Sequence, residues 1–251
     1  MAGAALLTPA IVLGAVRYGD TSRIVRLATR EHGVLSAIAK GALRPKSRFG
    51  AALQLLSEGH AHLIPSRNSE LYILAAFDLT ELHTGLANDL SRFAAASALA
   101  ETATRFIPPT PLPQLYDGLR ADIALLEQVP ADAIEVVTLR ALWHLIGELG
   151  LAPSLTACAR DGAVIPPGES AFSVSDGGLL CRRCAGGGST IQLGADDRDS
   201  LGSLVVPGRD LPILDGRHAA AHRRLFVRWV RHHLTDTPLP ALEAWQRGQS
   251  P

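Results

Sequence analysis

The stretch from Lys40 to Gly50 concentrates cationic side chains in a segment whose glycine and proline residues favour a loop. It contains both lysines of the chain. Cations on such a loop reach solvent without being buried, and they are the donors that the phosphates of a nucleic acid bind. An isolated run of four charges is usually an ordinary solvated surface, so neighbouring residues must decide between the two interpretations. The cations are Lys40, Arg44, Lys46 and Arg48.

The basic character extends beyond this loop. The formal net charge of the chain is zero, yet residues 17–48 carry eight cations against two acids. Residues 217–233 carry five arginines, four histidines and no acid. A polyanion responds to local clusters of charge rather than to the net charge, so we expect DNA binding. The residues expected to support the loop are Arg23, Arg26 and Arg30, with Arg224 and Arg228 as a weaker second patch.

Three cysteines and an aspartate follow the spacing of a zinc knuckle. In such a motif two Cys-x2-Cys pairs lie on tight turns that face one tetrahedral ion. We favour a structural zinc here, because a small glycine-rich segment has little core to hold it. The alternatives are an empty site, a site completed by a distant histidine, and a redox Cys-x-x-Cys, which normally begins a helix. The predicted ligands are Cys158, Asp161, Cys181 and Cys184.

Motifs of known catalytic sites are missing from the sequence. The segment from Gly41 to Ser47 resembles a phosphate-binding loop, but Pro45 replaces its second glycine and has no N–H to donate. There is no Gly-x-Ser-x-Gly elbow, no His-Glu-x-x-His motif and no tight acidic cluster for two-metal chemistry. We therefore expect a protein that is not an enzyme. The alternative is a zinc- or thiol-dependent enzyme built on the three cysteines.

The elements that position these residues begin with β structure. Over the first eighty residues, short runs rich in β-branched side chains alternate with glycine, proline and asparagine. Five such strands fit a small barrel, of which the OB-fold is the commonest DNA-binding form, and an SH3-like barrel is the competitor. The strands are expected near residues 11–13, 24–27, 34–39, 60–64 and 71–75.

Beyond Thr80 the apolar residues recur at helical spacing, so the fold class is α+β. Asn88 or Asp89 is expected to cap the first of three antiparallel helices, which end at proline or glycine. The expected domains are an OB-fold at 1–80, the first part of a helical bundle at 81–150, a zinc-finger-like insertion at 151–190, the second part of the bundle at 191–235, and a loose proline-rich tail at 236–251.

The apolar residues at the start of the chain are a feature of secretory signal peptides. Residues 1–16 are uncharged, but they lack the basic first region of a signal peptide and contain Pro9. No window of the sequence approaches the apolar length that spans a bilayer. A cytosolic protein is therefore expected, and secretion is the minor alternative.

Taken together, these motifs resemble the bacterial RecO family of recombination mediators. The resemblance covers nearly the whole chain and is most specific over residues 10–50, and it returns at the cysteine-containing segment. The residues that carry it are Ala10–Leu13, Tyr18–Val25, Thr29–Gly33, Ala39–Gly41, Arg44–Gly50, Phe172–Ser173, Gly177–Cys181 and Cys184.

The resemblance implies an amino-terminal OB-fold and a helical domain with a zinc-finger-like insertion. It also implies binding of single- and double-stranded DNA, and annealing of complementary strands without ATP, at the cytoplasmic nucleoid. The partners implied are RecR, the acidic tail of single-strand-binding protein and, indirectly, RecA. Asp161 departs from the family pattern, because many relatives with a knuckle carry four cysteines.

The barrel offers few aromatic side chains for base stacking, so we expect phosphate-directed charge to contribute most of the DNA affinity. The candidates for stacking are Tyr18, Phe49, Tyr72 and Phe77. The alternative function in a different class is an interaction scaffold, whose basic loop binds acidic protein tails rather than DNA.

Overall fold

The structure is a computed structural model that describes residues 4–66, 69–186 and 188–248. The chain forms two compact units, one up to Ala131 and one from Asp132 onward. The expected boundary after Thr80 coincides with the change from strands to helices, whereas the first compact unit continues through two helices beyond it.

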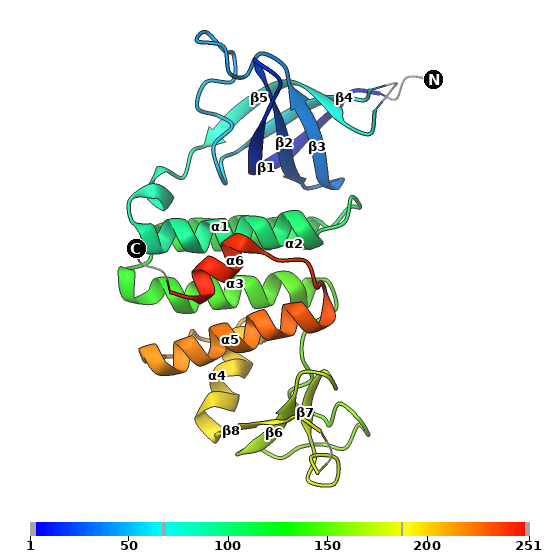
Figure 1. Ribbon diagram of the computed structural model, residues 1–251, viewed down its shortest axis with the longest axis vertical. Coiled ribbons are helices and arrows are strands. Elements are labelled where there is room, and N and C mark those ends of the chain that lie inside the picture. Colours follow the sequence, from blue (N-terminus) through cyan, green and yellow to red (C-terminus); the bar gives the residue numbers. More distant parts are fainter. Residues whose placement is uncertain (1–3, 67–68, 187, 249–251) are drawn as a thin grey trace. The chain divides into compact units, whose positions relative to one another are not determined.

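The first unit begins with a closed five-stranded barrel in the strand order β1-β2-β3-β5-β4 (Figure 1). All neighbouring strands are antiparallel except β3 and β5, which pair in parallel. This arrangement confirms the OB-like barrel. The strands are β1 (Leu6–Tyr18), β2 (Ser22–Thr29), β3 (Gly33–Ala39), β4 (Glu58–Ile64) and β5 (Tyr72–Glu81).

Alternation of apolar and polar residues fixes which side of each strand faces the barrel interior. Val25 and Leu27 of β2 are buried, for example, whereas Arg26 between them is exposed. The β2–β3 turn ends at Gly33, whose φ of 65° favours glycine. A Cβ atom there would lie 1.9 Å from the carbonyl oxygen of Pro108. Only glycine at position 33 therefore lets this turn pack closely against the segment that contains Pro108.

Two helices complete the first unit, α1 (Leu90–Phe106) and α2 (Pro113–Gln128), after a short 3-10 helix, η1 (Thr84–Ala87). Asp89 caps α1 by accepting a hydrogen bond from the backbone N–H of Arg92, which confirms the predicted cap. The buried guanidinium of Arg92 then donates to the carbonyl oxygens of Leu126 and Val129. It thereby satisfies carbonyls that the end of α2 leaves without helical partners.

The second unit combines four helices with a small sheet. Trp143, Phe226 and Trp229 form its aromatic core, with ring centroids 5.0 and 5.8 Å from that of Trp143. Strands β6, β7 and β8 form a sheet in the order β7-β6-β8, which confirms a non-helical insertion between helices. The elements are η2 (Ala131–Ala133), α3 (Ile134–Glu148), β6 (Ser170–Ser173), β7 (Gly178–Leu180), β8 (Ile191–Leu193), α4 (Ala195–Val205), α5 (Gly216–His233) and α6 (Pro240–Gln246).

The expectation of a loose tail from residue 236 is wrong for the described part of that segment. Helix α6 packs against α5 and buries Leu242 and Trp245. Pro240 stands in its first turn, where the missing N–H has no helical partner to lose. Arg231 of α5 also binds Glu243 at 2.7 Å. Residues 249–251 lie outside the described residues.

The longest helix, α5, has 18 residues and carries the second basic segment. Its apolar side chains and His222 are buried on one face, and Arg217, Arg224, Arg228 and Arg231 are exposed on the other. Within the described ranges, no helix combines the length and the apolar composition needed to cross a membrane.

Candidate nucleic-acid interface and metal centre

The cationic loop lies between β3 and β4 and is held by a succession of tight turns. The backbone N–H of Arg44 donates to Gly41, that of Ser47 to Arg44, and that of Gly50 to Ser47. Three apolar side chains of the same loop are buried in the barrel core, namely those of Phe49, Ala52 and Leu53. The loop is therefore anchored to the barrel on one side, and its polar residues are left on the other.

All four predicted loop cations are exposed: Lys40, Arg44, Lys46 and Arg48. The guanidinium of Arg48 lies 5.1 Å from the ring centroid of Phe49, within the range of a cation–π contact. Ser47 uses its hydroxyl oxygen to accept from the N–H of Phe49 at 3.2 Å. Anchored cations lose less conformational freedom when they bind phosphates than cations on an unanchored loop would.

The three predicted arginines of the β2 region occupy different environments. Arg23 pairs in register with Ala39, next to the start of the cationic loop. Arg26 is exposed and its guanidinium donates to the hydroxyl of Ser36 on β3. Arg30 instead forms a two-point ion pair with Asp117 of α2, at 3.0 and 2.9 Å. The hydrogen bond and charge of Asp117 raise the pKa of Arg30.

Of the four aromatic candidates for base stacking, Tyr18 is the exposed one. Phe49 and Phe77 are buried in the barrel core, and Tyr72 is half-buried against it. Tyr18 stands at the end of β1 with 52% of its surface exposed. Two residues before it, Val16 is 63% exposed and pairs with Ile24 of β2. Because alternate residues share a face, Tyr18 and Val16 give the barrel a small apolar platform.

We expect Tyr18→Ala to weaken single-strand binding about fivefold, in line with the loss of one stacked base, and to leave duplex binding nearly unchanged. The bases of a duplex are already stacked on one another and do not present their faces. Fluorescence anisotropy with matched single strands and duplexes measures both affinities. Tyr72→Ala is the comparison on the same barrel, and equal losses for the two strand types would contradict the stacking role.

The four predicted metal ligands come together within the second unit. Their ligand atoms all lie within 4.8 Å of one another, and no histidine belongs to this group within the described residues. Cys158 is buried, Cys181 and Cys184 are half-buried, and Asp161 is at the surface. Each pair occupies a tight turn, in which Gly162 N–H donates to Cys158 and Cys184 N–H donates to Cys181.

Hydrogen bonds around the cluster favour an ionised Asp161. Its pKa lies well below the ordinary value because of the Cys158 thiol and the backbone N–H of Ala163. Arg183 binds the same carboxylate at 2.9 Å. Burial, followed by hydrogen bonding with Cys181, raises the pKa of Cys184 to about 12. The backbone of the turn is braced by Arg160, which bridges Asp176 and the carbonyl oxygen of Cys184.

This donor set fits a tetrahedral metal ion. Four ligands at the usual zinc distances would be separated from one another by roughly 3.8 Å. The ligand atoms here lie within 4.8 Å of one another, and Asp161 Oδ2 is 3.5 and 3.4 Å from the sulfurs of Cys181 and Cys184. The Cys181-to-Cys184 pair lies in a turn rather than at the start of a helix, as a metal knuckle requires and a thioredoxin-like redox motif does not. The residues that would hold the ion are Cys158, Asp161, Cys181 and Cys184.

The second basic patch lies on α5. Arg224 and Arg228 are both exposed, and Arg228 reaches the hydroxyl of Ser189 at 3.4 Å. Arg231, on the same face, is engaged by Glu243 of α6. The structure therefore offers Arg224 and Arg228 as the cations of this patch that can meet a phosphate.

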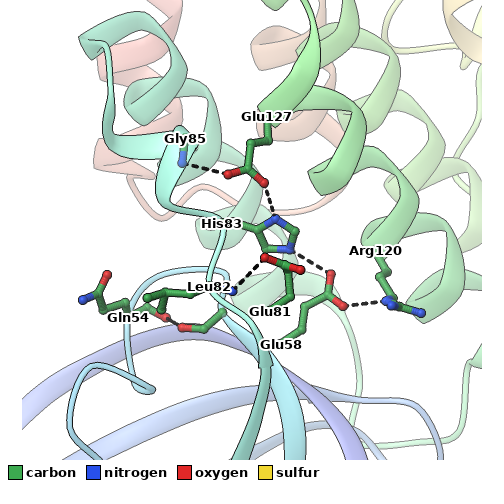
Figure 2. Close-up of polar contacts among 9 residues, drawn as sticks. Gln54, Glu58, Glu81, Leu82, His83, Gly85, Arg120 and Glu127 are labelled. Atoms are coloured by element: carbon green, nitrogen blue, oxygen red, sulfur yellow. Dashed lines mark hydrogen bonds and ion pairs between the residues drawn. The ribbon is translucent and has the colours of Figure 1, made fainter.

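Sequence reasoning missed a charged network between the barrel and α2 (Figure 2). His83 donates or accepts at both ring nitrogens, 2.9 Å from Glu58 and 2.6 Å from Glu127. Glu58 also accepts from Arg120 at 2.5 Å, and Glu127 accepts from the backbone N–H of Gly85 at 2.7 Å. The side chains of His83 and Glu58 are only 4% and 5% exposed.

The charges of this network support one another. Burial lowers the pKa of His83, but its hydrogen bonds to Glu58 and Glu127 outweigh burial and raise it overall. Burial likewise raises the pKa of Glu58, and the hydrogen bonds from His83 and Arg120 lower it overall. The network thus places the buried side chains of His83 and Glu58 between the partly exposed Glu127 and the exposed Arg120, and its members come from β4, the segment after β5, and α2.

Comparison with known proteins agrees with this architecture. The family described as "Recombination protein O N terminal" matches residues 1–83, and "Recombination protein O C terminal" matches residues 87–190. A DNA repair protein RecO from Anaeromyxobacter dehalogenans (strain 2CP-C) is 33% identical over 237 residues, 89% of either chain. Another, from Pelobacter propionicus, is 36% identical over 180 residues, which are 71% of this chain and 72% of the relative. The chain belongs to the RecO family and has a role in DNA repair and recombination.

Proposed function

We propose that this protein is a non-catalytic recombination mediator that binds single- and double-stranded DNA and anneals complementary strands without ATP. The observation that carries the proposal is the anchored loop of four exposed cations on an OB-like barrel. Phosphate contacts of this kind hold a strand without reading its sequence. Annealing needs that property, because two strands of any sequence must be brought together.

The proposal includes the partners that the family resemblance implies. With RecR, the protein would help to load RecA onto single strands covered by single-strand-binding protein, whose acidic tail it would recognise. The protein would then act at the nucleoid, in the cytoplasm. A structural zinc ion held by Cys158, Asp161, Cys181 and Cys184 is part of the proposal, and it is supported by the size and chemistry of that cluster.

The test is annealing of two complementary oligonucleotides without ATP, at low and at moderate salt. We expect the wild-type protein to accelerate annealing and the variant Lys40→Ala with Arg44→Ala to lose most of that acceleration. Loss of two phosphate contacts should also reduce the slope of log affinity against log salt by about 1.4 for single strands. Arg105→Ala with Arg209→Ala is the charge-matched control, because both arginines are exposed and lie outside the two basic segments.

The competing function is a scaffold whose loop binds acidic protein tails. An acidic peptide that binds more tightly than an oligonucleotide of equal charge, together with no annealing at either salt, would favour the scaffold. An unchanged salt slope in the double variant would remove the loop from the DNA-binding site.

A further inference from the structure

A cavity of about 440 Å³ lies beside the second basic patch, in the second unit. Its volume falls in the usual range of sites for small organic groups, roughly 300–1,000 Å³. Its apolar lining residues come from β8 and α5 and are Ile191, Leu193, Ala221 and Leu225. Arg224 and Arg228, one helical turn apart, also line it.

A buried histidine lines the same cavity without its hydrogen bonds. His222 is 3% exposed, and neither of its ring nitrogens has a hydrogen-bond partner among the residues that the structure describes. Burial lowers its pKa, so the neutral ring offers one donor and one acceptor. Buried polar groups are normally satisfied. The ring nitrogens of His222 have almost no exposed surface, so a ligand in the cavity would pair with them only after the ring rotates toward it.

Two further polar side chains, Gln192 and Asp197, line the cavity. An amide, a carboxylate and an imidazole together offer donors and acceptors of the kind that the edge of a nucleobase needs. Apolar side chains such as Leu193 and Leu225 suit the faces of a base. The carboxylate of Asp197 can accept a hydrogen bond from the amino group of a base, a contact that the carboxylates of an acidic peptide cannot make. The arginines attract phosphate.

We propose that this cavity receives one unpaired base of a DNA strand, while the phosphates next to that base bind Arg224 and Arg228. The inference rests on the proposed DNA-binding function and adds a preference for single strands at this second patch. A base in a duplex cannot enter, because it is stacked and paired, and removing it from the stack requires energy. All residues that line the cavity lie from Ile191 onward, whereas the match to the C-terminal family description ends at residue 190.

The test compares single-strand and duplex binding by the full-length protein after the cavity is filled. Ala221 is exposed at the cavity, so Ala221→Phe fills it without changing a charge. We expect this variant to bind a labelled single strand roughly tenfold more weakly and a duplex of the same length nearly as well as wild type. Ala220→Phe makes the same change at a half-buried residue of the same helix that does not line the cavity and is the matched control.

A second variant tests the phosphate contacts of the two arginines without filling the cavity. Arg224→Ala with Arg228→Ala should lower the single-strand salt slope by about 1.4. Arg217→Ala, an exposed arginine of α5 that does not line the cavity, should change it less. Thermal unfolding of each variant shows whether the fold is retained, so that a binding loss can be assigned to the cavity.

Three results would overturn the proposal. The first is unchanged single-strand binding in Ala221→Phe, and the second is an equal loss for single strands and duplexes. The third is that Ala221→Phe no longer binds an acidic peptide but still binds the single strand as wild type does, which would assign the cavity to a protein tail. If one of these results is found but Lys40→Ala with Arg44→Ala still weakens binding of both strand types, only the cavity proposal fails and the proposed DNA-binding function is retained. If the wild type binds neither, the proposed function itself fails.

Discussion

Replacing His83 with leucine is expected to lower the free energy of unfolding by about 3 kcal/mol near neutral pH. Leucine fills a similar space but removes the cation between Glu58 and Glu127, which lie 2.9 and 2.6 Å from the imidazole. Glu58 is almost fully buried and would keep Arg120 as its partner, while Glu127 would keep the N–H of Gly85. Urea unfolding with linear extrapolation measures the loss.

The matched control is His62→Leu on the same barrel. His62 also pairs with a carboxylate, Asp78 at 2.7 Å, but its side chain is 41% exposed. Exposed ion pairs contribute about 0–1 kcal/mol, so this variant should be close to wild type. Adding Glu58→Gln to His83→Leu should recover part of the stability, because it removes the carboxylate that is left with fewer partners. Similar losses in His83→Leu and His62→Leu would contradict a special role for burial.

The same network predicts how the effect depends on pH. The pKa of His83 is raised above its ordinary value of 6.5, so its stabilising charge is fully present below that pH and is lost as the pH rises through the raised value. The pKa of Glu58 is lowered from 4.5, so its contribution is present above that pH and is lost as the pH falls through the lowered value. The difference between wild type and His83→Leu should therefore be largest at about pH 5–6.5. A difference that grows as the pH rises above this window would refute the charged pairing.

The second large effect is expected from the metal cluster. We expect the protein to contain one zinc ion, and a strong chelator to lower the thermal stability of the second unit, because metal binding and folding of such a segment are coupled. Bound thiolates react slowly with thiol reagents, so chelation should also expose the thiols of Cys158, Cys181 and Cys184. Zinc content, thermal unfolding and thiol titration measure these outcomes without any activity assay.

Substitution of the unusual ligand tests the assignment directly. Asp161→Cys restores four thiolates and should raise zinc affinity by about tenfold or more, because thiolates bind zinc more strongly than a carboxylate does. Asp161→Ala should weaken zinc binding and also release Arg183 from its ion pair. Asp199→Ala is the control, since Asp199 is an exposed aspartate of α4 that does not belong to the cluster. Equal zinc affinity in all three variants would exclude Asp161 as a ligand.

Local patterns in the sequence predicted much of the fold. Short runs rich in β-branched residues between glycine and proline indicated the barrel strands, and the helical stripes together with Asp89 indicated α1. The spacing of the cysteines indicated the metal cluster, because turns bring residues three apart to the same side. The loop cations were identifiable for a similar reason, since glycine and proline next to charges predict an exposed loop.

Contacts between distant residues could not be predicted in this way. Arg30 appears in the sequence as one more basic residue, but its guanidinium is bound by Asp117, 87 residues away. Likewise, His83 is 25 residues from Glu58 and 44 from Glu127. The short apolar pattern of α6 indicates a helix only once α5 provides a surface on which Leu242 and Trp245 are buried.

The barrel, the order of the helices, the cationic loop and the four candidate metal ligands could therefore be predicted from residues that are close along the chain. Only the folded chain shows which cations are exposed, that the buried His83 lies between two carboxylates, and that α5 and β8 line a cavity. The physical reason is that burial and ion pairing depend on which segments meet, and this is fixed by packing of the whole unit rather than by any local pattern.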